Sequence, residues 1–135
     1  MRPALVVTSG ILLAFPAAAA SGIEVGRGDD TTVYGSCVPS LVAENKSAET
    51  IDYLQVDLEL TLADGAKRVL ELQSAYREGI LYPIAPGGKA TLRQHLDTSR
   101  ALGVACDRIE RRKVVHVECI AAGGRTCLSP VSAEP

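Results

Sequence analysis

One stretch decides the fold: ETIDYLQVDLELTLADG, residues 49–65. Five apolar residues alternate along it with five more polar ones, namely Leu54, Val56, Leu58, Leu60 and Leu62 with Tyr53, Gln55, Asp57, Glu59 and Thr61. Because successive side chains of a β-strand point to opposite faces, this period of two predicts a strand with one buried and one solvent-facing side. Asp64-Gly65 then supplies a turn, and KRVLELQ at 67–73 is predicted to return as its partner, with Leu70 and Leu72 inward.

Short stretches of the same kind, separated by turn residues, fill the rest of the chain. We expect a strand at 37–44 before Asn45-Lys46-Ser47 and an alternating strand at 89–97 after Pro86-Gly87-Gly88. A hairpin of 103–109 with 114–120 and a last strand, TCLSPV, at 126–131 after Gly123-Gly124 should follow. In that hairpin, Glu110 to Lys113 form the tip, and Val115, Val117 and Cys119 share the inner face. About seven short strands with turns between them predict an all-β, antiparallel β-sandwich.

The first twenty residues have the layout of a secretory signal peptide. Arg2 supplies a positive charge, an apolar run extends over 4–15, and Ala18-Ala19-Ala20 fits an A-x-A cleavage site. The run is shorter than the roughly 20 residues that a membrane-spanning helix needs. We therefore expect residues 1–20 to be removed and residues 21–135 to form one periplasmic or secreted domain without a membrane span.

Composition narrows the choice of partners. The 14 Lys and Arg residues include Arg2, which leaves 13 of them against 16 acidic residues and a mature net charge near −3. No long block of one charge is present, which makes nucleic acid a poor partner. Trp is absent, and Phe15 and Met1 are the only residues of their kinds, so the mature core must consist mainly of Leu, Val, Ile and Ala.

The four cysteines are predicted to form two disulfides, because the chain is expected to reach an oxidising compartment. They are Cys37, Cys106, Cys119 and Cys127. A metal site and a reactive thiol are weaker alternatives, since the chain has neither a short zinc knuckle nor a Cys-x-x-Cys motif.

The expected hairpin favours one of the three possible pairings. With its tip at 111–112, Cys106 and Cys119 are diagonal neighbours, beyond normal disulfide geometry. Cys119 and Cys127 flank the Gly123-Gly124 turn and can lie opposite each other, which leaves Cys37 for Cys106. A register slip of one residue would favour a different pairing.

The order Cys37, Asn45-Lys46-Ser47, Leu58-x-Leu60, Asp64-Gly65, Pro86-Gly87 and Cys106 resembles small exported bacterial domains of the immunoglobulin or fibronectin-III type. FxLYD-type domains and the interleukin-receptor-mimic proteins of pathogenic enterobacteria have this general layout. The resemblance covers about 37–119 and implies an immunoglobulin-like sandwich without catalytic activity, in which a 37–106 disulfide crosses the core. The chain departs from antibody domains in lacking the buried Trp and in having Val104 where a tyrosine stands two residues before the later cysteine.

Catalytic motifs are scarce. The chain has no Gly-x-Ser-x-Gly elbow and no glycine-rich phosphate loop, so we expect no enzyme and no cofactor. His95 and His116, with an acidic neighbour such as Glu118, are the residues that a copper or zinc site would use. Solvated strand residues are the simpler interpretation of both histidines. Arg27-Gly28-Asp29 spells the integrin-binding tripeptide, which we interpret as a polar loop.

One apolar stretch, YREGILYPIAPGG at 76–88, lacks clean alternation. It is either a core strand or an exposed patch of the composition used for protein binding, with Ile80, Leu81, Tyr82 and Ile84 as the interface. The strand 67–73, with the apolar 80–84 segment beyond it, is predicted to be an edge that has no guard apart from Lys67, Arg68 and Glu71. Self-association or docking of a partner is therefore expected at 67–84. The sequence thus predicts an exported, non-enzymatic module of the cell envelope that binds a protein through an edge strand or loop. The alternative is a periplasmic metal-binding protein using surface histidines.

Overall fold

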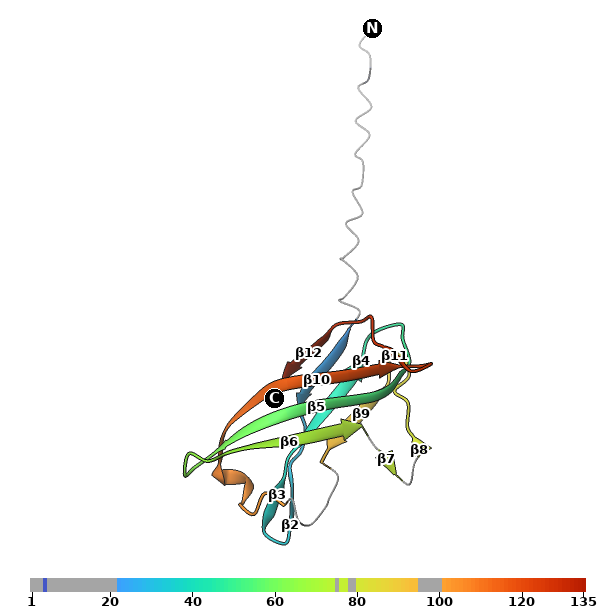
Figure 1. Ribbon diagram of the computed structural model, residues 1–135. Coiled ribbons are helices and arrows are strands. Elements are labelled where there is room, and N and C mark those ends of the chain that lie inside the picture. The colour runs from blue at the N-terminus through green and yellow to red at the C-terminus, as the bar shows by residue number, and fades with distance from the viewer. Residues whose placement is uncertain (1–3, 5–21, 75, 78–79, 95–100) are drawn as a thin grey trace.

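The computed structural model describes residues 4, 22–74, 76–77, 80–94 and 101–135, which form an all-β fold (Figure 1). The strands are β1 (Ile23–Arg27), β2 (Thr31–Val33), β3 (Ser36–Val38), β4 (Ser40–Asn45), β5 (Ile51–Leu62), β6 (Lys67–Ser74), β7 (Tyr76–Arg77), β8 (Ile80–Leu81), β9 (Lys89–Arg93), β10 (Ile109–Ala121), β11 (Arg125–Thr126) and β12 (Val131–Glu134). A single 3-10 turn at Cys106–Arg108 precedes β10. The expected signal peptide, 1–20, lies outside the described residues apart from Ala4. No helix of the described part is long and apolar enough to cross a membrane.

Eight strands form one curled sheet in the order β11-β10-β5-β6-β9-β4-β1-β12. In Figure 1, β5, β6 and β10 lie in front of β1, β4 and β9, so that the two halves of the sheet face each other. A short pairing of β6 with β9, at Gln73 and Ser74, joins the halves. The all-β prediction is confirmed, but an immunoglobulin-like sandwich of two separate sheets is not, because this pairing makes the sheet continuous.

The core fills the space between the two halves. The alternation predicted for residues 54–62 is confirmed, since Leu54, Val56, Leu58 and Leu60 are fully buried on β5 and Leu62 is nearly so. Leu70 and Leu72 of β6 join them, as expected, and Leu41 and Leu92 contribute from β4 and β9. Each fully buried leucine stabilises the fold by about 1.5–3 kcal/mol relative to an exposed one.

The predicted hairpin at 103–120 is wrong. β10 is one continuous strand whose whole length pairs with β5, so the charged residues 110–113 lie within a strand and do not form a tip. A bulge between Val114 and His116 then shifts the register and changes which side chains face inward. Val115, expected inside, is 45% exposed, whereas Val114 and Val117 pack against the core.

Two other strand predictions need correction. The strand expected at 37–44 is divided by Pro39 into β3, which pairs with β2, and β4, which pairs with β1 and β9. Proline lacks the N–H that a continuous ladder would need there. The stretch 67–73, expected at an edge, is part of β6 and is an edge only as far as Leu72, because residues 67–72 pair with β5 alone within the described chain, whereas Gln73 also pairs with β9.

Asn45 is the main polar group of the interior and is fully buried. Its side-chain Nδ2 donates to the carbonyl oxygens of Glu49 (2.7 Å) and Ile84 (3.0 Å). Its Oδ1 accepts from the N–H (3.0 Å) and the hydroxyl (2.6 Å) of Ser47. Its main-chain groups bond the turn at 87–88. Asn45 therefore fixes three segments of chain at the end of β4.

Replacing Asn45→Ala should lower the free energy of unfolding by about 2–3 kcal/mol, because the N–H of Ser47 would lose its partner away from water and the carbonyls of Glu49 and Ile84 would each lose one hydrogen bond. Urea unfolding monitored by circular dichroism measures this. The control is Lys46→Ala, which alters an exposed neighbour and should leave stability close to that of the wild type. Equal midpoints for the two variants would contradict the role given to Asn45.

Candidate functional site

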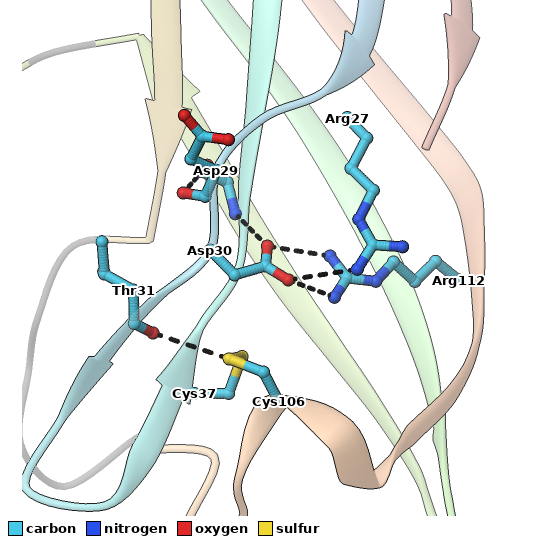
Figure 2. A network of polar contacts seen from close by, with 8 residues as sticks. Arg27, Asp29, Asp30, Thr31, Cys37, Cys106 and Arg112 are labelled. Atoms are coloured by element: carbon cyan, nitrogen blue, oxygen red, sulfur yellow. Dashed lines mark hydrogen bonds and ion pairs between the residues drawn. A yellow bond between two sulfur atoms is a disulfide. The ribbon is translucent and has the colours of Figure 1, made fainter.

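A nearly buried ion pair lies beside the first disulfide (Figure 2). Asp30 follows β1, and Arg112 reaches it from the inner face of β10, opposite Leu60. The guanidinium of Arg112 donates twice, from Nη1 to Oδ1 at 3.1 Å and from Nη2 to Oδ2 at 2.6 Å. The two side chains are only 6% and 12% exposed, for Arg112 and Asp30 respectively. Arg27, which is 58% exposed, adds a longer contact of 3.3 Å to Oδ2.

These contacts set the charge of Asp30. Burial by itself would raise the pKa of its carboxyl group. The hydrogen bonds and positive charge of Arg112, the main-chain N–H of Ser40 and the hydrogen bond from Arg27 together outweigh burial and hold the pKa below its usual value. Asp30 is therefore a carboxylate throughout the physiological range.

The main chain around Asp30 is fixed by β4. Gly28 N–H donates to the Ser40 carbonyl at 2.9 Å, and the Ser40 hydroxyl donates to the Asp29 carbonyl at 2.6 Å. A Cβ at Gly28 would lie 2.5 Å from the Ser40 hydroxyl oxygen, so only glycine fits without a shift. Arg27 is the last residue of β1, and Gly28 and Asp29 follow it in an irregular segment, as the expected polar loop requires; β4 holds this loop in place.

The disulfides join Cys37 to Cys106 and Cys119 to Cys127, the pairing that the sequence favours. The pairing is correct even though one of its premises, the hairpin tip at 111–112, is wrong. Cys106 lies just before β10, and Cys119 lies near the end of β10. The two disulfides therefore fasten loops at opposite ends of the same long strand.

One group of potential metal ligands comes together within the described residues. A carboxylate oxygen of Asp30 and the sulfurs of Cys37 and Cys106 all lie within 4.8 Å of one another. Both sulfurs belong to the disulfide and neither is a thiolate, while Asp30 already accepts two hydrogen bonds from Arg112. In the oxidised protein these three residues therefore form a structural cluster and do not form a metal site. The Cys106 sulfur also lies 3.7 Å from the Thr31 carbonyl oxygen, a contact that involves no thiol proton because the sulfur is in the disulfide.

The short β2–β3 hairpin extends from this cluster, since Thr31 begins β2 and Cys37 belongs to β3 (Figure 2). Its base is held by the Cys37 disulfide, by Cys37 N–H donating to the Val104 carbonyl (2.7 Å), and by the Gly103 N–H donating to the Ser36 hydroxyl (2.8 Å). Its tip carries Tyr34, whose exposure reaches 102%. The hairpin is therefore rigid at its base and presents an aromatic ring at its end.

The second disulfide fixes another loop. Cys127 N–H donates to the Cys119 carbonyl at 3.1 Å, and the carboxylate of Glu49 accepts from the N–H of Leu128 and from both the N–H (2.9 Å) and the hydroxyl (2.7 Å) of Ser129. The Ser129 hydroxyl, followed by the main-chain N–H groups of Ser129 and Leu128, lowers the pKa of Glu49. The side chain of Leu128 is 87% exposed.

The predicted interface residues do not form one exposed patch. Ile84 is 4% exposed and exchanges two main-chain hydrogen bonds with Ile51, so it belongs to the core and the exposed alternative is wrong for it. Tyr82 is half-exposed. Ile80 and Leu81 form β8, and their side chains lie outside what the structure describes.

The structure describes one of the two histidines of the metal hypothesis. His116 is exposed on β10, opposite Asp57 in the register. His95 lies outside the described residues. A site built from both histidines therefore stays a prediction.

Sequence reasoning missed Asp30, Arg112 and Tyr34. The partners Asp30 and Arg112 are far apart in the chain, and no local pattern links them. A signal for Tyr34 was present, because Tyr34-Gly35 stands between TTV and SCV, two short runs suited to a hairpin with a two-residue turn.

Replacing Asp30→Asn should lower the free energy of unfolding by about 3 kcal/mol at neutral pH, because Arg112 would keep a nearly buried charge without its counter-ion. The folded pKa of Asp30 lies below the ordinary 3.8, so its contribution is fully present above that value and is lost as the pH falls through the folded pKa. Urea titrations from about pH 7 to about pH 2 should therefore show a smaller acid-dependent loss in the variant.

The matched control for that experiment is Arg27→Gln, which removes the exposed partner of the same carboxylate and should change stability by less than about 1 kcal/mol. A wild-type midpoint for Asp30→Asn, or an unchanged acid limb, would show that the ion pair does not stabilise the fold.

Removing the Cys37–Cys106 disulfide by a double Cys→Ser substitution should lower the free energy of unfolding by roughly 4 kcal/mol, because the bond closes a loop with a sequence separation of 69. The same change at Cys119 and Cys127, with a separation of 8, should have a smaller effect of roughly 2–3 kcal/mol. Calorimetry of the two variants compares them, and an equal or reversed order would contradict this ranking.

Comparison with known proteins identifies a similar fold and does not identify a family. No protein-family model matches the chain, and no curated protein matches it. Among solved structures, the chain is similar to IrmA from Escherichia coli, with a TM-score of 0.57 and 12% sequence identity over 84% of this chain and 91% of that protein. At this identity the likeness concerns the fold alone. The chain is a disulfide-bearing β-protein similar in fold to IrmA, and the likeness does not single out the immunoglobulin or fibronectin-III layout.

Proposed function

We propose that the chain is an exported, non-enzymatic accessory protein of the cell envelope that binds another protein through its loops. Two disulfides fit an oxidising compartment outside the cytoplasm. The signal-like first twenty residues agree with export. The likeness in fold to IrmA supports an all-β scaffold for this role.

One observation carries the proposal. Among the described residues, the two most exposed large apolar side chains are Tyr34 (102%) and Leu128 (87%). Each lies within three residues of a disulfide cysteine, Cys37 and Cys127 respectively. A loop that is already ordered loses little conformational entropy when a partner binds, so a fixed and exposed apolar side chain is suited to recognition.

Site-specific photo-crosslinking in the native host tests this proposal. A benzoylphenylalanine placed at position 34 or 128 should give a discrete adduct with another protein of the envelope. The control position is Glu71, which is exposed on the outer face of β6 and should give none. Absence of adducts from both loops in a folded, oxidised protein would contradict protein binding through these loops.

A further inference from the structure

We infer that the tip of the β2–β3 hairpin is the recognition element, with Tyr34 as an anchor that enters an uncharged, apolar pocket of a partner protein. This inference rests on the proposed function and selects one of the two loops. The hairpin projects beyond the curled sheet at the lower end of Figure 1.

The backbone at the tip is unusual for tyrosine. Val33 pairs with Ser36, so Tyr34 and Gly35 are the two central residues of the turn, with φ of +48° and +75°. Positive φ at both positions is what a type I′ turn requires, and Gly, Asn and Asp accept it most readily. Tyr34 is the one non-glycine residue with positive φ among the described residues.

No contact of the Tyr34 side chain within the described part of the fold compensates for this backbone strain. The ring of Tyr34 is completely exposed, and its hydroxyl makes no hydrogen bond within the described part of the chain. A residue in a sparsely populated conformation persists where function requires its side chain. An asparagine would suit the turn better, so the aromatic ring itself is the feature that needs an explanation.

The hairpin is also organised in advance of binding. The disulfide and the bonds of Cys37 and Ser36 to residues 103–104 hold its base, as described above. Tyrosine adds a large contact area with few rotatable bonds, which keeps the entropic cost of binding low. Aromatic side chains of this kind are common among the dominant residues of protein interfaces.

Charge around the tip points to the chemistry of the partner. Thr31–Ser36 contains no ionisable group except the phenol of Tyr34, and Asp30, the carboxylate that directly precedes this segment in the chain, is neutralised by Arg112. A lipid surface is disfavoured, because peripheral binding uses cationic residues and a wider apolar face than Tyr34 and Val33 provide. An uncharged pocket on a protein is the surface that matches this tip, and its binding should depend little on salt.

Leu128 is the weaker of the two loop candidates. The main chain around it is occupied in holding the Glu49 carboxylate, through the N–H groups of Leu128 and Ser129. The loop therefore has a structural reason for its conformation, whereas the conformation of Tyr34 has none.

Stability provides a first test that needs no partner. Tyr34→Asn should raise the melting temperature by about 3 °C, because asparagine adopts positive φ more easily. Tyr82→Asn is the matched control, since Tyr82 is half-exposed and has no positive φ, and it should not raise the melting temperature. A lower melting temperature for Tyr34→Asn would show that the ring supports the fold and would overturn the inference.

Binding provides the second test, with a random peptide library displayed on phage as the probe and the oxidised protein as the target. Peptides selected on the wild type should be apolar and bind Tyr34→Asn at least about tenfold more weakly, a loss of about 1.4 kcal/mol. They should bind Leu128→Ser as they bind the wild type, at both low and high salt. Peptides that depend on Leu128 alone would overturn the hairpin inference and leave the proposed function standing, whereas failure to select any peptide would count against both.

The membrane alternative is tested separately. The chain has no Trp, so Tyr34→Trp provides a single fluorescent reporter at the tip. Vesicles of phosphatidylethanolamine and phosphatidylglycerol should leave its emission unchanged. A blue shift that is absent from Tyr82→Trp would indicate insertion into lipid and would overturn the protein pocket.

Discussion

The contact between Asp30 and Arg112 joins the two halves of the curled sheet. Asp30 follows β1 in one half, and Arg112 belongs to β10 in the other. The Cys37–Cys106 disulfide makes a covalent connection at the same place. A bidentate pair requires its two planar groups to align, and a disulfide limits the distance between its cysteines, so together they fix how far the sheet can open at this end.

Much of the fold follows from local pattern. The alternation along β5, the Asp64-Gly65 turn and the return of β6 were all predictable, because each depends on the period of two and on turn chemistry within a few residues. β10 was not predictable in the same way. Its charged residues 110–113 have the composition of a turn, yet they remain in the strand because β5 is long enough to pair with all of it. Tertiary pairing overrides local composition there.

The candidate site also combines one feature that the local sequence favours with one that it does not indicate. The cysteine pairing could be favoured from turns and spacing, but the ion pair beside it joins residues whose sequence separation is 82 and which share no periodic pattern. Ile84 and Tyr82 are two residues apart in one apolar stretch, and one is buried while the other is half-exposed. What separates them is the hydrogen bonding of Ile84 to Ile51 and of its carbonyl to Asn45, which only the assembled structure defines.

The β10 edge of the sheet bears on the proposal that the chain binds a partner through its loops. Beyond its pairing with β5, β10 pairs with another strand of the described chain only at Ile120 and Ala121, so most of its outer edge has no ladder partner there. That edge carries Glu110, Arg111 and Lys113 and is interrupted by the bulge before His116. Charged side chains and bulges are the features by which native sheets prevent strand addition. An edge with these features cannot serve easily as a docking strand. The β2–β3 tip carries neither charged side chains nor a bulge, which agrees with the proposal that this hairpin is the part that binds a partner.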